Sequence, residues 1–171
     1  MNKQSRQQST ELFRLIIVVI AIAVAITIIL PYLLLPFIEH DGSDPTDNAR
    51  MLLSDLYNKP NVWKETRGVT FSPAAPFLSK EAVVLHTPIT KEQICFSLGD
   101  FAGSEGEWEI TKTKLEHKIV PSRLVRLGII CDKGKKALEA DVKEVVSDAV
   151  LESCSCSEEQ TCCAIVLRRV R

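Results

Sequence analysis

The residues best suited to chemistry are six cysteines, four of which crowd the C-terminal end of the 171-residue chain. They are Cys95, Cys131, Cys154, Cys156, Cys162 and Cys163. Thiolates this close together suit zinc, but the spacing Cys-x-Cys-x5-Cys-Cys is not a repeated C-x2-C pair, and the segment contains no histidine. An even number of cysteines in an exported domain favours disulfides instead. The sequence therefore predicts disulfides, with no metal site and no cofactor.

The spacing of the cysteines does not choose among the many ways of pairing six thiols. In one arrangement, the four C-terminal cysteines surround a short acidic turn and staple the last strand to the end of the preceding helix. Cys95 and Cys131, each within a predicted strand, then form the third bridge. A thiol-redox centre at Cys154 and Cys156 is a further alternative.

The rest of the chain carries no recognisable catalytic motif. His40, His86 and His117 are isolated from one another in the sequence. There is no phosphate-cradling glycine loop and no G-x-S-x-G motif. The formal net charge of −1 gives no sign of the basic surface that binds nucleic acid. We therefore expect a structural or binding protein that is not an enzyme and has no nucleic acid among its partners.

A long apolar segment precedes the elements that must position the cysteines. No charged residue occurs from Leu15 to Ile38, and an α-helix of that length crosses a hydrocarbon core of about 30 Å. No small-residue cleavage site follows Ile38, as it would after a secretory signal peptide. We expect a single transmembrane helix over residues 7–38, in contact with membrane lipid.

The charges that flank the apolar segment predict its orientation. Lys3, Arg6 and Arg14 lie before it or just inside it, whereas cations are scarce directly after Ile38. Cytoplasmic flanks of membrane helices carry the excess of lysine and arginine. The N-terminus is therefore predicted to lie inside the cell membrane, and residues 39–171 to form an extracytoplasmic head domain.

A motif lies directly before the apolar run and overlaps its first residue. It is formed by Gln7, Ser9, Glu11 and Leu15, in the pattern Q-x-S-x-E-x-x-x-L. This pattern resembles the class III, prepilin-type signal of archaeal type IV pilin-like proteins. The resemblance implies that a membrane prepilin peptidase cuts between Arg6 and Gln7, so that residues 1–6 are a cytoplasmic leader. Arg6 stands where that family usually has a small residue such as glycine.

The resemblance also implies a role in assembly for Glu11, together with Ser9 and Leu15. A carboxylate at the edge of an apolar helix is costly to bury and needs a partner. The freed amino group of Gln7 in a neighbouring subunit would supply the opposite charge. A plainer alternative places Glu11 in the headgroup zone beside Arg14.

The function implied by this resemblance is structural. The chain is expected to be a subunit of a cell-surface filament, or a minor pilin-like membrane protein, that associates with itself or with other pilin-like subunits through its N-terminal helix. The alternative is an unprocessed, signal-anchored protein whose outer domain binds a ligand.

Residues 39–171 suffice for one compact head domain. Asp44 as N-cap, Pro45 at the first helical position and a stop at residues 58–60 predict a first helix. A second helix has an apolar face that runs from Leu138 to Ala149.

Short runs rich in β-branched residues predict the strands of the head domain. They are residues 82–87, 93–98, 108–120, 123–131 and 164–170. A capping box of Thr90 with Gln93 is an alternative that makes the second of them a helix. Side chains alternate in the last strand, so we expect one of its faces to be buried and the other to be wet. The expected fold is α+β, a disulfide-bonded head with a mostly antiparallel sheet and at least two helices.

Overall fold

The computed structural model describes residues 44–104, 106–119 and 122–170. The chain separates into two units, Met1–His40 and Asp41–Arg171, and all described residues belong to the second. No helix among the described residues is long and apolar enough to cross a membrane. The transmembrane helix expected over residues 7–38 lies outside the described part of the chain.

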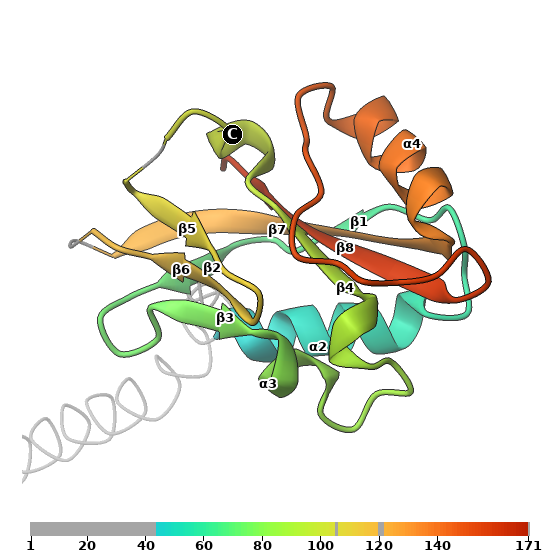
Figure 1. The fold of residues 1–171 in the computed structure, drawn as a ribbon. Coiled ribbons are helices and arrows are strands. Elements are labelled where there is room, and N and C mark those ends of the chain that lie inside the picture. The colour runs from blue at the N-terminus through green and yellow to red at the C-terminus, as the bar shows by residue number, and fades with distance from the viewer. Residues whose placement is uncertain (1–43, 105, 120–121, 171) are drawn as a thin grey trace, which may run out of the picture. The chain divides into compact units, whose positions relative to one another are not determined.

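The described residues form an α+β fold (Figure 1). In chain order its elements are α2 (Pro45–Leu56), β1 (Lys64–Glu65), β2 (Val69–Phe71), β3 (Phe77–Ser79), α3 (Lys80–Val84), η1 (Lys91–Gln93), β4 (Ile94–Ser97), η2 (Gly99–Phe101), β5 (Trp108–Ile110), β6 (Lys114–His117), β7 (Arg123–Lys133), α4 (Lys135–Val145) and β8 (Thr161–Arg168). The elements η1 and η2 are single 3₁₀ turns.

The strand β7 organises the main sheet. It pairs antiparallel with β8 on one side and with β1 and β2 on the other. The strand β4 lies on the far side of β8 and is parallel to it. A second, three-stranded sheet has the order β3-β6-β5 and is antiparallel. The expected α+β class and mostly antiparallel sheet are therefore confirmed.

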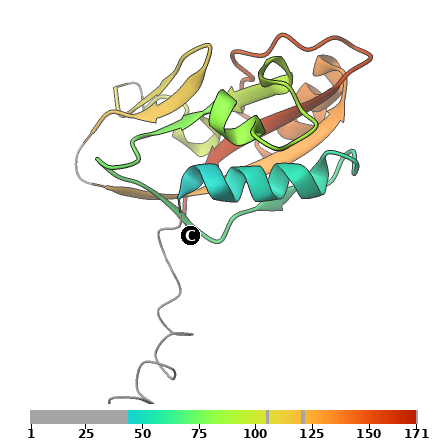
Figure 2. The same cartoon turned by 90° about the horizontal axis from the view of Figure 1, so that it is seen from below.

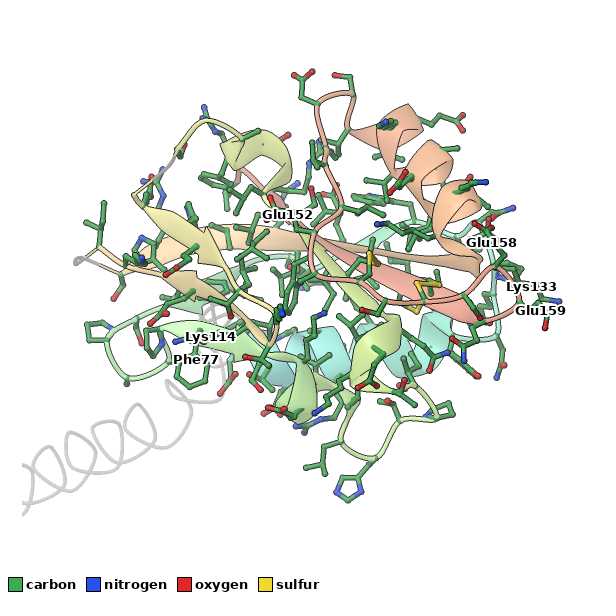
Figure 3. The ribbon with its side chains drawn as sticks, viewed as in Figure 1. Phe77, Lys114, Lys133, Glu152, Glu158 and Glu159 are labelled. Atoms are coloured by element: carbon green, nitrogen blue, oxygen red, sulfur yellow. A yellow bond between two sulfur atoms is a disulfide. The ribbon has the colours of Figure 1, made fainter. Side chains whose placement is uncertain are left out.

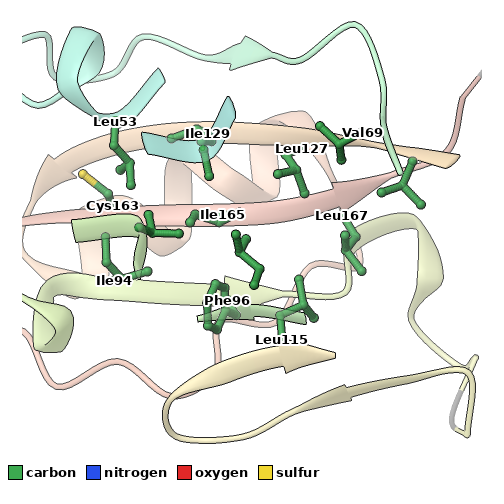
Figure 4. Packing of buried hydrophobic residues seen from close by; sticks show 14 of the residues in the cluster. Leu53, Val69, Ile94, Phe96, Leu115, Leu127, Ile129, Cys163, Ile165 and Leu167 are labelled. Carbon is green, nitrogen blue, oxygen red and sulfur yellow. The ribbon is translucent and has the colours of Figure 1, made fainter. Parts of the chain in front are cut away.

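A helix covers each face of the main sheet. Successive side chains of a strand point to opposite faces, and β8 contributes Ile165 to the core beneath α2 and Val166 to the core beneath α4. Figure 2 shows α2 lying across its side of the sheet. Figure 4 shows how Leu53 of α2 meets Ile129 and Ile165 in the larger core.

Both helices follow from local sequence patterns. The Asp44 carboxylate accepts a hydrogen bond from the Thr46 backbone N–H at 2.7 Å, and Pro45 begins α2, as predicted. Ala49, Leu53 and Leu56 are fully buried on one face of this helix. In α4, Leu138 and Val142 pack against the opposite face of the sheet. The predicted apolar face continued to Ala149, but α4 ends at Val145, whose side chain is exposed, so Val146 and Ala149 join the core from the segment after the helix.

The prediction that one face of the last strand is wet is wrong. Every side chain from Cys162 to Leu167 is buried. The reason is tertiary: β8 is a central strand between β7 and β4, with α2 on one face and α4 on the other. Strands covered on both faces have continuous apolar sequences.

Two other predicted strands differ from the structure. Residues 82–87 belong to the short helix α3 and the turn after it, and the Ser79 hydroxyl accepts a hydrogen bond from the Ala82 N–H at 3.5 Å. The predicted strand 108–120 is a hairpin of β5 and β6. The Thr111 hydroxyl accepts from the Lys114 N–H at 3.2 Å and so stabilises its turn.

For residues 90–98, the predicted strand and the alternative capping box are both partly correct. The Thr90 backbone N–H donates to the Gln93 side-chain oxygen at 2.8 Å, as in a capping box. That contact closes the short turn η1, and the strand β4 follows at once.

Candidate functional site

All six cysteines form disulfides, as predicted. The pairs are Cys95–Cys154, Cys131–Cys163 and Cys156–Cys162. Figure 3 draws the disulfides as yellow bonds. Cys95–Cys154 and Cys156–Cys162 involve the loop that precedes β8, whereas Cys131–Cys163 joins β7 to β8. Cys154 and Cys156 have different partners, so they do not form a redox pair with each other. The four C-terminal cysteines are all used in disulfides and do not form the alternative zinc cluster.

The arrangement that joins Cys95 to Cys131 and pairs the four C-terminal cysteines with one another is not the one in the structure. Cys131 lies directly opposite Cys163 in the antiparallel register of β7 and β8, and both side chains belong to the core beneath α2. Cys95 lies two strands away on β4 and points to the core beneath α4. Strand order and the alternation of faces therefore separate the two thiols.

The bridge Cys95–Cys154 attaches the loop between α4 and β8 to β4. A pair of backbone hydrogen bonds reinforces it, because the Phe96 N–H donates to the Glu152 carbonyl at 3.1 Å and the Glu152 N–H donates back at 2.8 Å. Residues 152–155 are consequently held against the sheet by both covalent and hydrogen bonds.

A pocket of about 470 Å³ opens beside this loop. Four separate segments line it: the start of α3, the turn η1, the β5–β6 turn and the loop after α4. The lining residues are Lys80, Lys91, Glu92, Lys112, Thr113, Ser153, Cys154 and Ser155. A volume of this size is typical of sites for small molecules.

Backbone hydrogen bonds connect the walls of the pocket. The Lys80 N–H donates to the Thr113 carbonyl at 2.8 Å, and the Ser155 N–H donates to the Glu92 carbonyl at 3.1 Å. The Lys91 ammonium also lies 3.3 Å from a Glu81 carboxylate oxygen. These contacts fix the four segments relative to one another, so the pocket is preformed.

Lys80 is the most unusual residue of the pocket, because it is only 2% exposed. Its ammonium donates to the Ser153 carbonyl and lies 5.5 Å from the centre of the Phe96 ring. Burial lowers the pKa of Lys80 from 10.5 to about 8, and the nearby Glu92 carboxylate opposes this effect. Within the described residues, no carboxylate lies within 4.0 Å of this ammonium.

Ser153 is unusual in two respects. Its backbone has φ 57°, a left-handed conformation that residues other than glycine rarely adopt. Its hydroxyl oxygen is buried and has no hydrogen-bond partner in the described structure. Buried hydroxyls are nearly always hydrogen-bonded, so this hydroxyl lacks the partner that such groups normally have.

The two described histidines lie in different surroundings. His86 is exposed, while His117 is buried in a small cluster with Trp108, their ring centres 4.6 Å apart. Burial lowers the pKa of His117, and Glu107, 3.6 Å away, opposes this. His40 lies outside the described residues, and no group of three His, Cys, Asp or Glu side chains in the described part could hold a metal ion.

The residues predicted to direct processing and assembly remain predictions. Arg6, Gln7, Ser9, Glu11 and Leu15 all lie outside the described residues.

The lysine pocket was not apparent in the sequence, because its lining residues come from four separate segments and form no motif.

No protein-family model, no curated protein and no solved structure matches this chain.

Proposed function

We propose that this protein is a pilin-like structural subunit, anchored by its N-terminal helix and carrying a disulfide-bonded head outside the cytoplasm. The observation that carries this proposal is the Q-x-S-x-E-x-x-x-L motif abutting the uncharged segment Leu15–Ile38. Such a segment is long enough to span a bilayer.

The state of the cysteines supports the extracytoplasmic placement of the head. All six are paired, and two of the three bridges include a cysteine outside the named strands. Disulfides persist in oxidising compartments and are rare in the cytosol. Three bridges in so small a domain therefore favour export of residues 39–171.

Assembly would rest on the N-terminal helix. After cleavage, the amino group of Gln7 in one subunit would pair with the Glu11 carboxylate of its neighbour. In a low-dielectric bundle of helices, removing one member of such a pair costs about 3–5 kcal/mol.

The mature N-terminus and a Glu11→Ala variant test this proposal. Intact-mass analysis should find residues 1–6 removed and Gln7 at the N-terminus. Glu11→Ala should insert in the membrane and fold its head but fail to enter filaments, whereas the control Glu39→Ala at the far end of the apolar segment should assemble normally. Normal assembly of Glu11→Ala would refute the pairing.

The pocket around Lys80 favours a second candidate, a signal-anchored binding domain. Under this alternative the leader is retained and the head acts by binding a ligand. A full-length mass that includes residues 1–6, together with the absence of any oligomer, would favour it over the filament subunit.

A further inference from the structure

We infer that the pocket lined by Lys80, Lys112 and Ser153 binds a small oxyanion, namely a phosphate, sulfate or carboxylate group. This inference goes beyond the filament role and does not depend on assembly of the chain. It rests on the charge of the pocket, on two buried polar groups with unused hydrogen-bonding capacity, and on the rigidity of the walls.

The charges that line the pocket do not cancel. Three lysines, Lys80, Lys91 and Lys112, face one carboxylate, Glu92, which leaves two positive charges. Among the described residues, only one of these three lysines, Lys91, has a carboxylate within 4.0 Å, and that carboxylate belongs to Glu81, outside the lining. With Glu81 included, one excess positive charge remains. A pocket with excess positive charge attracts anions, and its low-dielectric walls strengthen the attraction.

Lys80 is suited to be the inner contact. An ammonium group has three N–H donors, and one of them is used by the Ser153 carbonyl. The Phe96 ring covers another side of the group without accepting a conventional hydrogen bond. The ammonium is thus largely removed from water yet still has donors to offer, and an oxyanion would supply both the missing charge and the missing acceptor.

Ser153 provides the second inner contact. Its hydroxyl is buried without a partner and belongs to the same residue whose carbonyl accepts from Lys80. A hydroxyl donates one hydrogen bond, and a charged oxygen is its strongest acceptor. Lys80 and Ser153 both line the pocket, so an ammonium and a hydroxyl are close enough to contact one small anion.

The loop that carries Ser153 is held in place before any ligand arrives. The disulfide Cys95–Cys154 follows it directly, and the Glu152–Phe96 hydrogen bonds precede it. Preorganisation of this kind lowers the entropic cost of binding. Between these two attachments, Ser153 has a left-handed backbone.

Calorimetric titration of the full chain in detergent micelles tests the inference. The probes are inorganic phosphate, sulfate and glucuronate, each added at constant ionic strength. We expect one saturable site with a Kd of about 1 mM or tighter for at least one probe. Tighter binding of glucuronate would identify a carboxylate-bearing sugar as the ligand class, and tighter binding of phosphate or sulfate would identify those groups.

Variants locate the site. Lys80→Met keeps the apolar stem and removes the charge, so it should raise the Kd about tenfold or more. Lys136→Met, an exposed lysine on α4, is the matched control and should bind like wild type. Lys112→Gln changes an exposed rim residue and should weaken binding without affecting the fold.

Ser153→Gly separates binding from stability. Glycine tolerates the left-handed backbone and removes the hydroxyl, so this variant should be at least as stable as wild type yet bind the anion more weakly. The inference is overturned if no probe gives saturable binding, if Lys80→Met and Ser153→Gly both bind like wild type, or if Lys136→Met weakens binding as much as Lys80→Met.

Discussion

The three disulfides should contribute unequally to stability, in an order set by the loops that they close. A cross-link stabilises a protein chiefly by restricting the unfolded chain, and the effect grows with the logarithm of loop length. The sequence separations are 59 for Cys95–Cys154, 32 for Cys131–Cys163 and 6 for Cys156–Cys162. The chain-entropy relation then gives about 4, about 3.7 and about 2 kcal/mol respectively.

The informative comparison is between the longest and the shortest loop. Replacing both cysteines of Cys95–Cys154 by alanine should cost about 2 kcal/mol more than the same change at Cys156–Cys162. The pair Cys131–Cys163 is a less direct test, because both side chains are fully buried and their loss also leaves a cavity in the core.

Urea unfolding of the segment 41–171, which forms its own compact unit, measures these differences. With a slope of about 1–3 kcal/mol per molar urea, the two midpoints should differ by about 1 M. Peptide mapping without reductant should confirm Cys95 linked to Cys154. A Cys95–Cys131 peptide would refute the pairing, and equal losses for the two variants would refute the loop-length reasoning.

The remaining predictions concern packing, capping and pH. A Cβ at Gly128 would lie 2.1 Å from the Trp63 ring, so Gly128→Ala should lower the free energy of unfolding by about 1–3 kcal/mol. In a Trp63→Leu background most of that loss should vanish, and an unchanged loss would contradict the proposed clash. Asp44→Ala should destabilise the head by about 1 kcal/mol through loss of the α2 cap, whereas the exposed control Asp148→Ala should have little effect on the unfolding midpoint. Burial lowers the pKa of His117 below its ordinary 6.5. The unfolded chain therefore binds more protons than the folded protein below that pH, and the stability of the fold should decrease on acidification. His117→Phe should flatten this pH dependence between about pH 7 and 5, and a variant that keeps the wild-type slope would contradict the reasoning.

Local sequence patterns were sufficient to predict several features of the head. The start of α2 depends on Asp44 and Pro45, which act on backbone groups within one helical turn. The apolar face of α4 depends on residues spaced by one turn. The even number of cysteines predicted that disulfides would form. The two helices are encoded by residues that are close together in the chain, and the formation of disulfides follows from the count of cysteines alone.

Features that depend on the order of the strands could not be predicted in this way. Cys95 does not pair with Cys131, because β4 and β7 lie on opposite sides of β8 and their cysteines point to opposite faces. The last strand is buried on both faces because two helices, distant in sequence, pack against it. Alternation within a strand predicts two faces, but it does not say what covers each face.

The pocket around Lys80 depends entirely on tertiary structure. In the sequence, Lys80 is an ordinary polar residue between two short apolar runs. Its burial, its contact with Phe96 and its proximity to Ser153 arise only when α3, β4 and the loop before β8 come together. From the sequence alone, the cysteines predicted that residues 39–171 would be cross-linked, which the structure confirms, and the apolar segment predicts their export, which stays a prediction. Packing of remote segments decided where a charge would be buried, because desolvation depends on every neighbour in space and not on neighbours in sequence.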